Sequence, residues 1–141
     1  MRDLANNLHF VPAFQPKAAV TDNTAQVSAI LDRRGYEAVA LALVTGVQSD
    51  ADATFTVLLE ESDASDMTGA TAVDDADLIG TEALASFTFA EDGVCRKLGY
   101  VGNKRYLRAT ITPANNTGNL FVAGLWVLGG ARSLPTANPP A

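Results

Sequence analysis

The chain has little of what catalysis or covalent crosslinking requires. Its 141 residues include one cysteine, Cys95, and one histidine, His9. A single cysteine cannot form an internal disulfide, so core packing and backbone hydrogen bonds must hold the fold, which suits a reducing compartment. A Cys–His or Ser–His–Asp arrangement needs a positioned base, whereas His9 lies in an irregular segment. We therefore expect a protein that is not an enzyme, with Cys95 as a small core residue of a strand.

Signatures of membranes, cofactors and nucleic acids are also missing. No apolar run approaches the roughly 18 residues of a membrane span, and the first residues lack the apolar region of a signal peptide, so we expect synthesis in a cytosol. The sequence contains no P-loop, no dinucleotide-type glycine fingerprint and no zinc-ligand spacing, so no cofactor is expected. The net charge of −6 argues against nucleic-acid binding.

Lysine and arginine are absent between Gly35 and Cys95, and acidic residues are absent after Asp92. Strands that pair acids with bases within one sheet would explain these halves. Complementary patches that steer copies of the chain, or a partner, together would also explain them. Asp50 with Asp52, and the acids within 74–77, could coordinate calcium, but no EF-hand spacing is present and acidic loops are often only solvated.

Short runs of apolar character between turn residues predict an all-β protein. Residues 36–45 (YEAVALALVT) and 120–128 (LFVAGLWVL) are apolar on both faces, so each is expected to be a central strand covered on both sides. Phe121 and Trp126 in the second run are expected to be core residues rather than a stacking platform. Further strands are predicted at 26–32, 54–60, 83–91, 94–101 and 104–112, with a short one at 70–73. About seven or eight strands favour a jelly-roll-like antiparallel β-sandwich, although a barrel stays possible.

Asp92-Gly93 predicts a hairpin between 83–91 and 94–101. Gly102-Asn103 is expected to join the next two strands, which would gather five basic side chains near one hairpin end: Arg96, Lys97, Lys104, Arg105 and Arg108. This cluster is either a solvated sheet face or a contact surface for an acidic protein partner.

The two ends differ from the middle of the chain. Residues 1–23 show neither the helical nor the strand repeat of apolar residues, so they are expected to form an extended N-terminal arm. Residues 24–130 are expected to form the sandwich domain, and residues 131–141 a proline-rich C-terminal tail. The arm carries Phe10, Val11 and Phe14, which lie either on their own domain or on a neighbouring subunit. With the basic cluster, these residues are the candidate protein-interaction residues.

Four segments resemble the cement, or decoration, proteins of tailed bacteriophages, most closely those of short-tailed phages. They are YEAVALALVTG, TFTVLLEESDASDMTGATAVDDADLIGT, CRKLGYVGNKRYLRATITP and LFVAGLWVLGG. The resemblance implies a jelly-roll-like sandwich that dimerises on the outside of an HK97-type capsid and clamps neighbouring major capsid subunits, which would place the chain in the virion. It implies no catalytic residues.

The predicted function is therefore that of a structural virion protein that stabilises the head. The alternative is a β-sandwich binding module that recognises a carbohydrate or a receptor.

Overall fold

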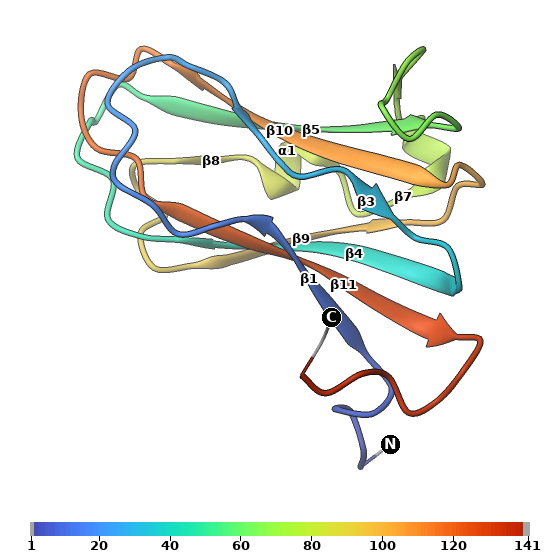
Figure 1. Cartoon of the computed structure of the whole chain (residues 1–141). Coiled ribbons are helices and arrows are strands. Elements are labelled where there is room, and N and C mark those ends of the chain that lie inside the picture. The colour runs from blue at the N-terminus through green and yellow to red at the C-terminus, as the bar shows by residue number, and fades with distance from the viewer. Residues whose placement is uncertain (1, 140–141) are drawn as a thin grey trace.

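Two antiparallel sheets pack face to face, and the chain crosses between them at most of its turns (Figure 1). The computed structural model describes residues 2–139. The five-stranded sheet has the order β1-β11-β4-β9-β7, with bounds His9–Phe14, Val122–Ala131, Tyr36–Thr45, Cys95–Tyr100 and Leu78–Ile79. The six-stranded sheet has the order β2-β10-β5-β6, with β3 also on β10 and β8 also on β5. Its bounds are Gln26–Val27, Tyr106–Ala114, Thr54–Ser62, Thr71–Ala72, Leu31–Asp32 and Phe87–Thr88.

This strand order confirms the predicted jelly-roll-like β-sandwich. Strands β1, β4, β9 and β11 share one sheet, while β2, β5 and β10, which come between them in the chain, share the other. Such alternation between two sheets is the double Greek key of a jelly roll. Two short helical turns interrupt the strands, η1 at Asp75–Asp77 and α1 at Glu82–Ala85. Within residues 2–139 no helix is long and apolar enough to cross a bilayer.

The core lies between the sheets and is built from the alternate positions of the long strands. Trp126 and Leu41 are 0% and 1% exposed from the five-stranded sheet, and Leu107 and Ile111 are both 0% exposed from the other. Phe55 stacks on Phe87 with ring centroids 5.1 Å apart. Burying side chains of this size contributes about 1.5–3 kcal/mol each, and this burial holds the two sheets together.

The predicted hairpin around Asp92-Gly93 is wrong. Residues 83–91 form the end of α1 and the short strand β8, and β8 pairs with β5 in the opposite sheet from β9. The Thr81 side chain caps α1 by accepting from Leu84 N at 3.1 Å. Glu82 then accepts from Leu59 N at 2.6 Å, and Ser86 Oγ from Val57 N at 2.9 Å. These two side chains accept hydrogen bonds from β5 amides in the gap between β6 and β8, where no strand lies beside β5 to pair with them.

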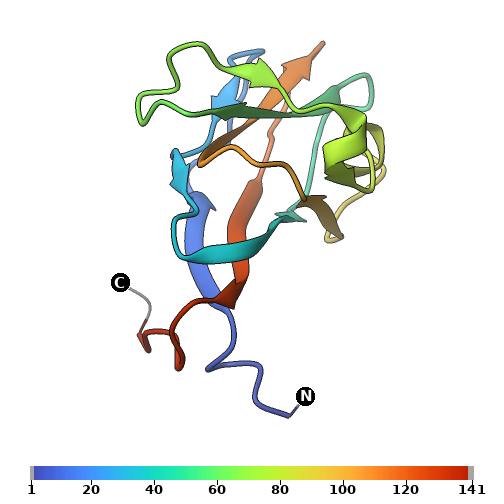
Figure 2. The same ribbon diagram turned by 90° about the vertical axis from the view of Figure 1, so that its right-hand side faces the viewer.

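The predicted N-terminal arm contains a strand of the domain itself. β1 pairs antiparallel with β11 from His9 to Phe14, so residues 9–14 lie on their own domain and not free of it. The C-terminal tail also folds back, because Thr136 N donates to Asn6 O at 2.9 Å and the Thr136 hydroxyl donates to Leu8 O at 2.7 Å. The segments at both ends of the described chain therefore lie together beyond β1 and β11 (Figure 2). Residue 1 of the predicted arm and residues 140–141 of the predicted tail lie outside the described residues.

Two core side chains, Leu43 and Phe14, approach the backbone of β11 closely at Gly124. A Cβ atom there would lie 2.7 Å from Leu43 Cδ2 and 3.0 Å from Phe14 Cδ2. At Gly129 in the same strand, the nearest atom would be Leu8 Cδ2 at 3.4 Å, an ordinary contact.

We predict that Gly124→Ala lowers the free energy of unfolding by about 1–3 kcal/mol, because overpacking forces core side chains to shift. The matched variant Gly129→Ala should stay within about 0.5 kcal/mol of the parent or be more stable, since it reduces backbone freedom of the unfolded chain. Urea unfolding of the two variants measures the difference. Equal stabilities would contradict this packing.

Candidate functional site

The outer face of the five-stranded sheet is apolar, although it faces away from the core. Apart from the Tyr36–Ala131 pair at the end of β4 and β11, where Tyr36 packs against the core, the register of β1, β11, β4, β9 and β7 places fourteen residues on this face. They are Phe10, Pro12, Ala38, Ala40, Ala42, Val44, Ile79, Cys95, Lys97, Gly99, Ala123, Leu125, Val127 and Gly129. Lys97 is the one charged residue among them. We call this surface the apolar face.

Several large side chains of the apolar face are open to solvent. Val44 is 46% exposed, Leu125 is 44% exposed and Ile79 is 63% exposed. A hollow of about 720 Å³ lies on this face beside Pro12, bordered by Ala42, Cys95 and Leu125. An exposed contiguous apolar surface with few charges is typical of a site that contacts another protein.

The outer face of the six-stranded sheet is different in kind. Its outward positions on β10 and β5 are Tyr106, Arg108, Thr110, Thr112, Ala114, Thr54, Thr56, Leu58, Glu60 and Ser62. Two of these ten are aliphatic, and the two charged side chains pair with each other. This sheet has the usual pattern of an antiparallel sheet with a core face and a solvated face. The contrast within one domain marks the apolar face as the unusual surface.

Three acids of the stretch between Gly35 and Cys95 pair with basic residues of the later half, as the first of the two explanations predicted in part. Arg108 lies opposite Glu60 in the strand register and its Nη2 is 2.8 Å from Glu60 Oε2. Arg105 binds both carboxylate oxygens of Asp32 at 2.8 and 2.7 Å, which holds the pKa of Asp32 below its usual value. Two further ion pairs join Lys104 to Asp63 and Arg96 to Glu91.

The basic residues do not form the single patch that the sequence predicted. Gly102-Asn103 leads from β9 in one sheet to β10 in the other, so Arg96 and Lys97 lie in one sheet, Arg108 lies in the other, and Lys104 and Arg105 lie in the connection between them. Four of the five form ion pairs within the chain. Lys97, on the apolar face, has no ion-pair partner among residues 2–139.

The three apolar residues predicted for the arm have three different positions. Phe10 is 37% exposed and faces outward, so it belongs to the apolar face. Val11 packs partly buried against the core. A register shift between Pro12 and Phe14 turns the Phe14 ring inward, where it is 7% exposed. Only Phe10 is therefore placed to contact a neighbour.

Two further expectations about single residues are wrong. Cys95 is exposed, because it lies opposite Val44 on the outward side of β9. Phe121 is 40% exposed, because it comes just before β11 begins at Val122 and not within the strand. Trp126 is fully buried as expected. His9 is buried and stacks on Tyr36 at 5.4 Å, on the opposite face of the sheet from Cys95 and three strands away from it.

The sequence contained a signal for the apolar face, namely two strands that are apolar on both sides, but this pattern was interpreted as burial on both sides. The residues that sequence reasoning did not select are chiefly small: Ala38, Ala40, Ala42, Ala123 and Leu125. They are the second apolar side of the two strands that were expected to be covered on both faces. One side of each strand packs on the core, and the other is the apolar face.

A tyrosine hydroxyl links the two sheets at the end of β9. Tyr100 is 2% exposed, its hydroxyl donates to Glu61 on β5, and it accepts from Lys104 N at 2.9 Å. The Arg33 guanidinium lies 5.4 Å from the ring centroid. Burial and the bond to Glu61 raise the pKa of Tyr100 well above its ordinary value.

No family model and no curated protein matches the chain. Among solved structures, it is similar to the C-terminal family 22 carbohydrate-binding module of Clostridium thermocellum Xyn10B, at 11% identity over 94% of this chain and 92% of that chain, with a TM-score of 0.49. A xylan-binding domain of the same family has 11% identity over 94% and 93%, with a TM-score of 0.47. The xylan-binding module CBM15 has 10% identity over 93% and 95%, with a TM-score of 0.42. These likenesses concern the fold.

The predicted function as a capsid clamp is contradicted. The structures named above are carbohydrate-binding modules and not capsid components. In addition, most of the basic side chains chosen for the contact are neutralised within the chain. Of the alternative, a β-sandwich binding module, the strand order shows the β-sandwich. The resemblance to phage decoration proteins, an HK97-type capsid partner and a place in the virion stay predictions.

We predict that the free energy of unfolding falls as the pH rises above about 10, the pKa of an unfolded tyrosine. Native Tyr100 keeps its proton to a higher pH than the unfolded chain does, so the native state binds more protons there and loses stability as the pH rises. Tyr100→Phe removes this titrating proton, so the free energy of unfolding should fall less steeply with pH, while Tyr106→Phe should leave the slope unchanged. Urea unfolding between pH 8 and 11 makes the comparison, and equal slopes in the three proteins would contradict it.

Proposed function

We propose that this chain is a non-catalytic binding module that acts by protein–protein contact, and that the apolar face is its contact surface. The observation that carries the proposal is the single charge among the fourteen outward residues of five neighbouring strands. Water meets this surface at large side chains such as Val44 and Leu125. Covering them with another apolar surface releases about 25 cal/mol for each Å² buried.

A protein surface suits this face better than a polysaccharide does. Sugar hydroxyls that leave water need hydrogen-bond partners, and each one left without a partner costs roughly 1–3 kcal/mol. The backbone groups of the inner strands are already paired in the sheet, and Lys97 is the only side chain of the apolar face with a strong donor. Phe10 is its one aromatic residue. Xylan, the ligand in the names of the similar structures, therefore lacks partners on this surface.

A second copy of this chain is the partner that we propose for the apolar face. The four longer strands, at about 4.8 Å spacing and 3.4 Å per residue, give a face of roughly 20 Å by 30 Å, close to the lower range of stable interfaces. A twofold axis along the strands, between β11 and β4, would place β9 of one copy over β1 of the other. Each Lys97 would then lie near the partner's β1 and away from the other Lys97.

We predict that the chain sediments at twice its monomer mass of 14.7 kDa, and that Leu125→Glu makes it monomeric. An unpaired carboxylate buried in the middle of this interface should weaken self-association by at least about 100-fold. Thr112→Glu, which adds the same charge to the outward face of the other sheet, should remain dimeric. Analytical ultracentrifugation over a concentration series distinguishes the three.

A wild-type protein that stays monomeric at every soluble concentration would contradict this proposal. A saturable rise in melting temperature with xylan oligosaccharides, lost in Leu125→Glu and kept in Thr112→Glu, would contradict it in favour of carbohydrate binding at the same face.

A further inference from the structure

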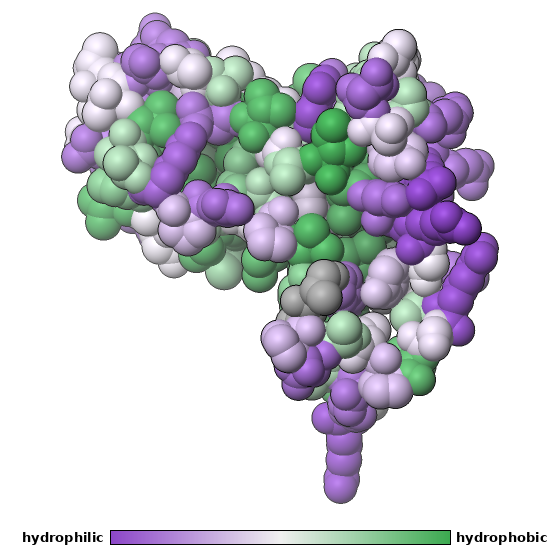
Figure 3. Space-filling model, in the orientation of Figure 1, coloured by the Kyte–Doolittle hydropathy of each residue, from purple (hydrophilic) through white to green (hydrophobic). Residues whose placement is uncertain are grey.

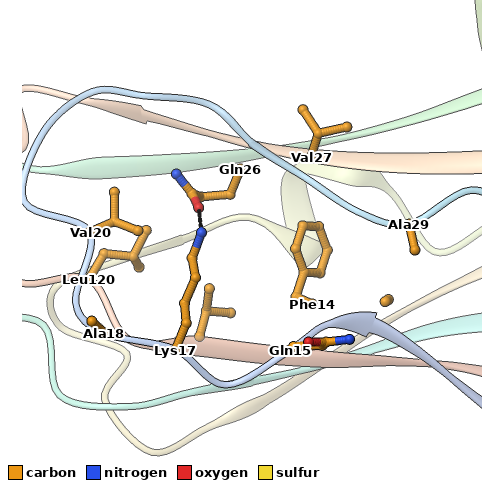
Figure 4. Close-up of a pocket in the computed structure, with 11 residues that line it drawn as sticks. Phe14, Gln15, Lys17, Ala18, Val20, Gln26, Val27, Ala29 and Leu120 are labelled. Carbon is orange, nitrogen blue, oxygen red and sulfur yellow. Dashed lines mark hydrogen bonds between the residues drawn. The ribbon is translucent and has the colours of Figure 1, made fainter.

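A separate cleft opens at the edge of the sandwich, between β1 of one sheet and β2 of the other (Figure 4). Its volume is about 250 Å³. The lining residues are Ala13, Phe14, Gln15, Lys17, Ala18, Val20, Gln26, Val27, Ala29, Leu120 and Val122. Figure 3, which looks onto this edge, shows hydrophobic residues reaching the surface between the two layers. No residue of the apolar face lines the cleft, although Phe14 and Gln15 also border the hollow on that face.

The walls of the cleft are fixed by backbone contacts. The register shift in β1 turns Ala13 and Phe14 inward together, and Ala29 N donates to Ala13 O at 3.3 Å, which joins the two sheets at one end. At the other end Val20 pairs with Leu120, with N–O distances of 3.1 and 2.9 Å. The connecting segment is held further by the buried Asn116, whose side chain donates to Val20 O at 3.2 Å. The cleft is thus preformed.

Two polar side chains face each other across the cleft. Lys17 Nζ donates to Gln26 Oε1, as the dashed line in Figure 4 marks. Gln26 is 7% exposed, and its amide nitrogen donates to Thr24 O at 2.8 Å, which fixes the direction of its oxygen. Lys17 itself is exposed, so its ammonium can leave Gln26 or share its remaining donors with a ligand.

The electrostatic character of the cleft is positive. None of its eleven lining residues is acidic, and Lys17 has no carboxylate within 4.0 Å among the residues that the structure describes. Four of the five basic side chains between residues 96 and 108 are neutralised by ion pairs, whereas Lys17 is not. An ammonium beside an apolar floor favours a ligand with one negative charge and an apolar body.

We propose that this cleft binds a small organic monocarboxylate with an aryl or short alkyl body. The carboxylate would accept from Lys17 at the mouth, and the body would lie against Phe14, Val20 and Leu120. Eight of the eleven lining side chains are apolar, so a sugar would leave hydroxyl groups without partners. The volume, slightly below the roughly 300 Å³ lower range of ligand pockets, limits the body to about one ring.

The test is a titration of the ¹⁵N-labelled chain with 3-phenylpropionate, followed by amide chemical shifts. We expect saturable shifts confined to residues 13–18, 26–29 and 120–122, the segments that line the cleft. The neutral analogue 3-phenylpropanamide and the hydroxyl-rich glucuronate should each bind at least about tenfold more weakly, because the first lacks the charge and the second lacks the apolar body.

Lys17→Met should weaken binding of 3-phenylpropionate by at least about tenfold and leave the weak binding of the amide unchanged. Lys104→Met is the matched control, since Lys104 lies outside the cleft and pairs with Asp63, and it should bind as the parent does. Equal affinity for the acid and the amide, shifts outside the cleft, or no loss in Lys17→Met would overturn the proposal. None of these readouts depends on whether the apolar face binds a partner.

Discussion

Successive side chains of a β-strand point to opposite faces of the sheet, so a strand that is apolar throughout has to be covered twice. β4 and β11 are two such strands, and they pair with each other over nine residue positions in the middle of the five-stranded sheet. The core covers one side of the pair through residues such as Leu41 and Trp126. The other side, with Val44 and Leu125, faces solvent in the single chain. The proposed function follows from this uncovered side.

The charged residues explain why the remaining surface is a weaker candidate for a partner. Arg108 and Glu60 lie on neighbouring strands at the same register position, and Arg105 holds Asp32 with two hydrogen bonds. Pairs of this kind satisfy each other and leave little net field with which to attract a third charged group. Lys17 and Lys97 stand apart from this network, Lys17 beside an apolar cleft and Lys97 on the apolar face.

The sequence predicted the long strands well, because each is a run of apolar or alternating residues that ends at a turn residue. The prediction of 36–45 agrees with β4 at both ends, and the sandwich itself is confirmed. Pairing partners were harder to predict, since a turn signal such as Asp92-Gly93 does not say whether the chain returns to the same sheet or crosses to the other. The same gap explains the predicted basic patch, which required β9 and β10 to be neighbours. Phe121 and Cys95 were misplaced because their side depends on where the strand begins and how it is covered.

The central claim is that the apolar face is buried by another copy of the chain, and the single cysteine reports on it directly. Cys95 lies on that face, exposed in the single chain, opposite Val44. The rate at which a thiol reagent modifies Cys95 should therefore fall as the protein concentration rises and copies associate, and it should remain high at all concentrations in Leu125→Glu. A modification rate that is independent of protein concentration in the wild-type chain would contradict the account.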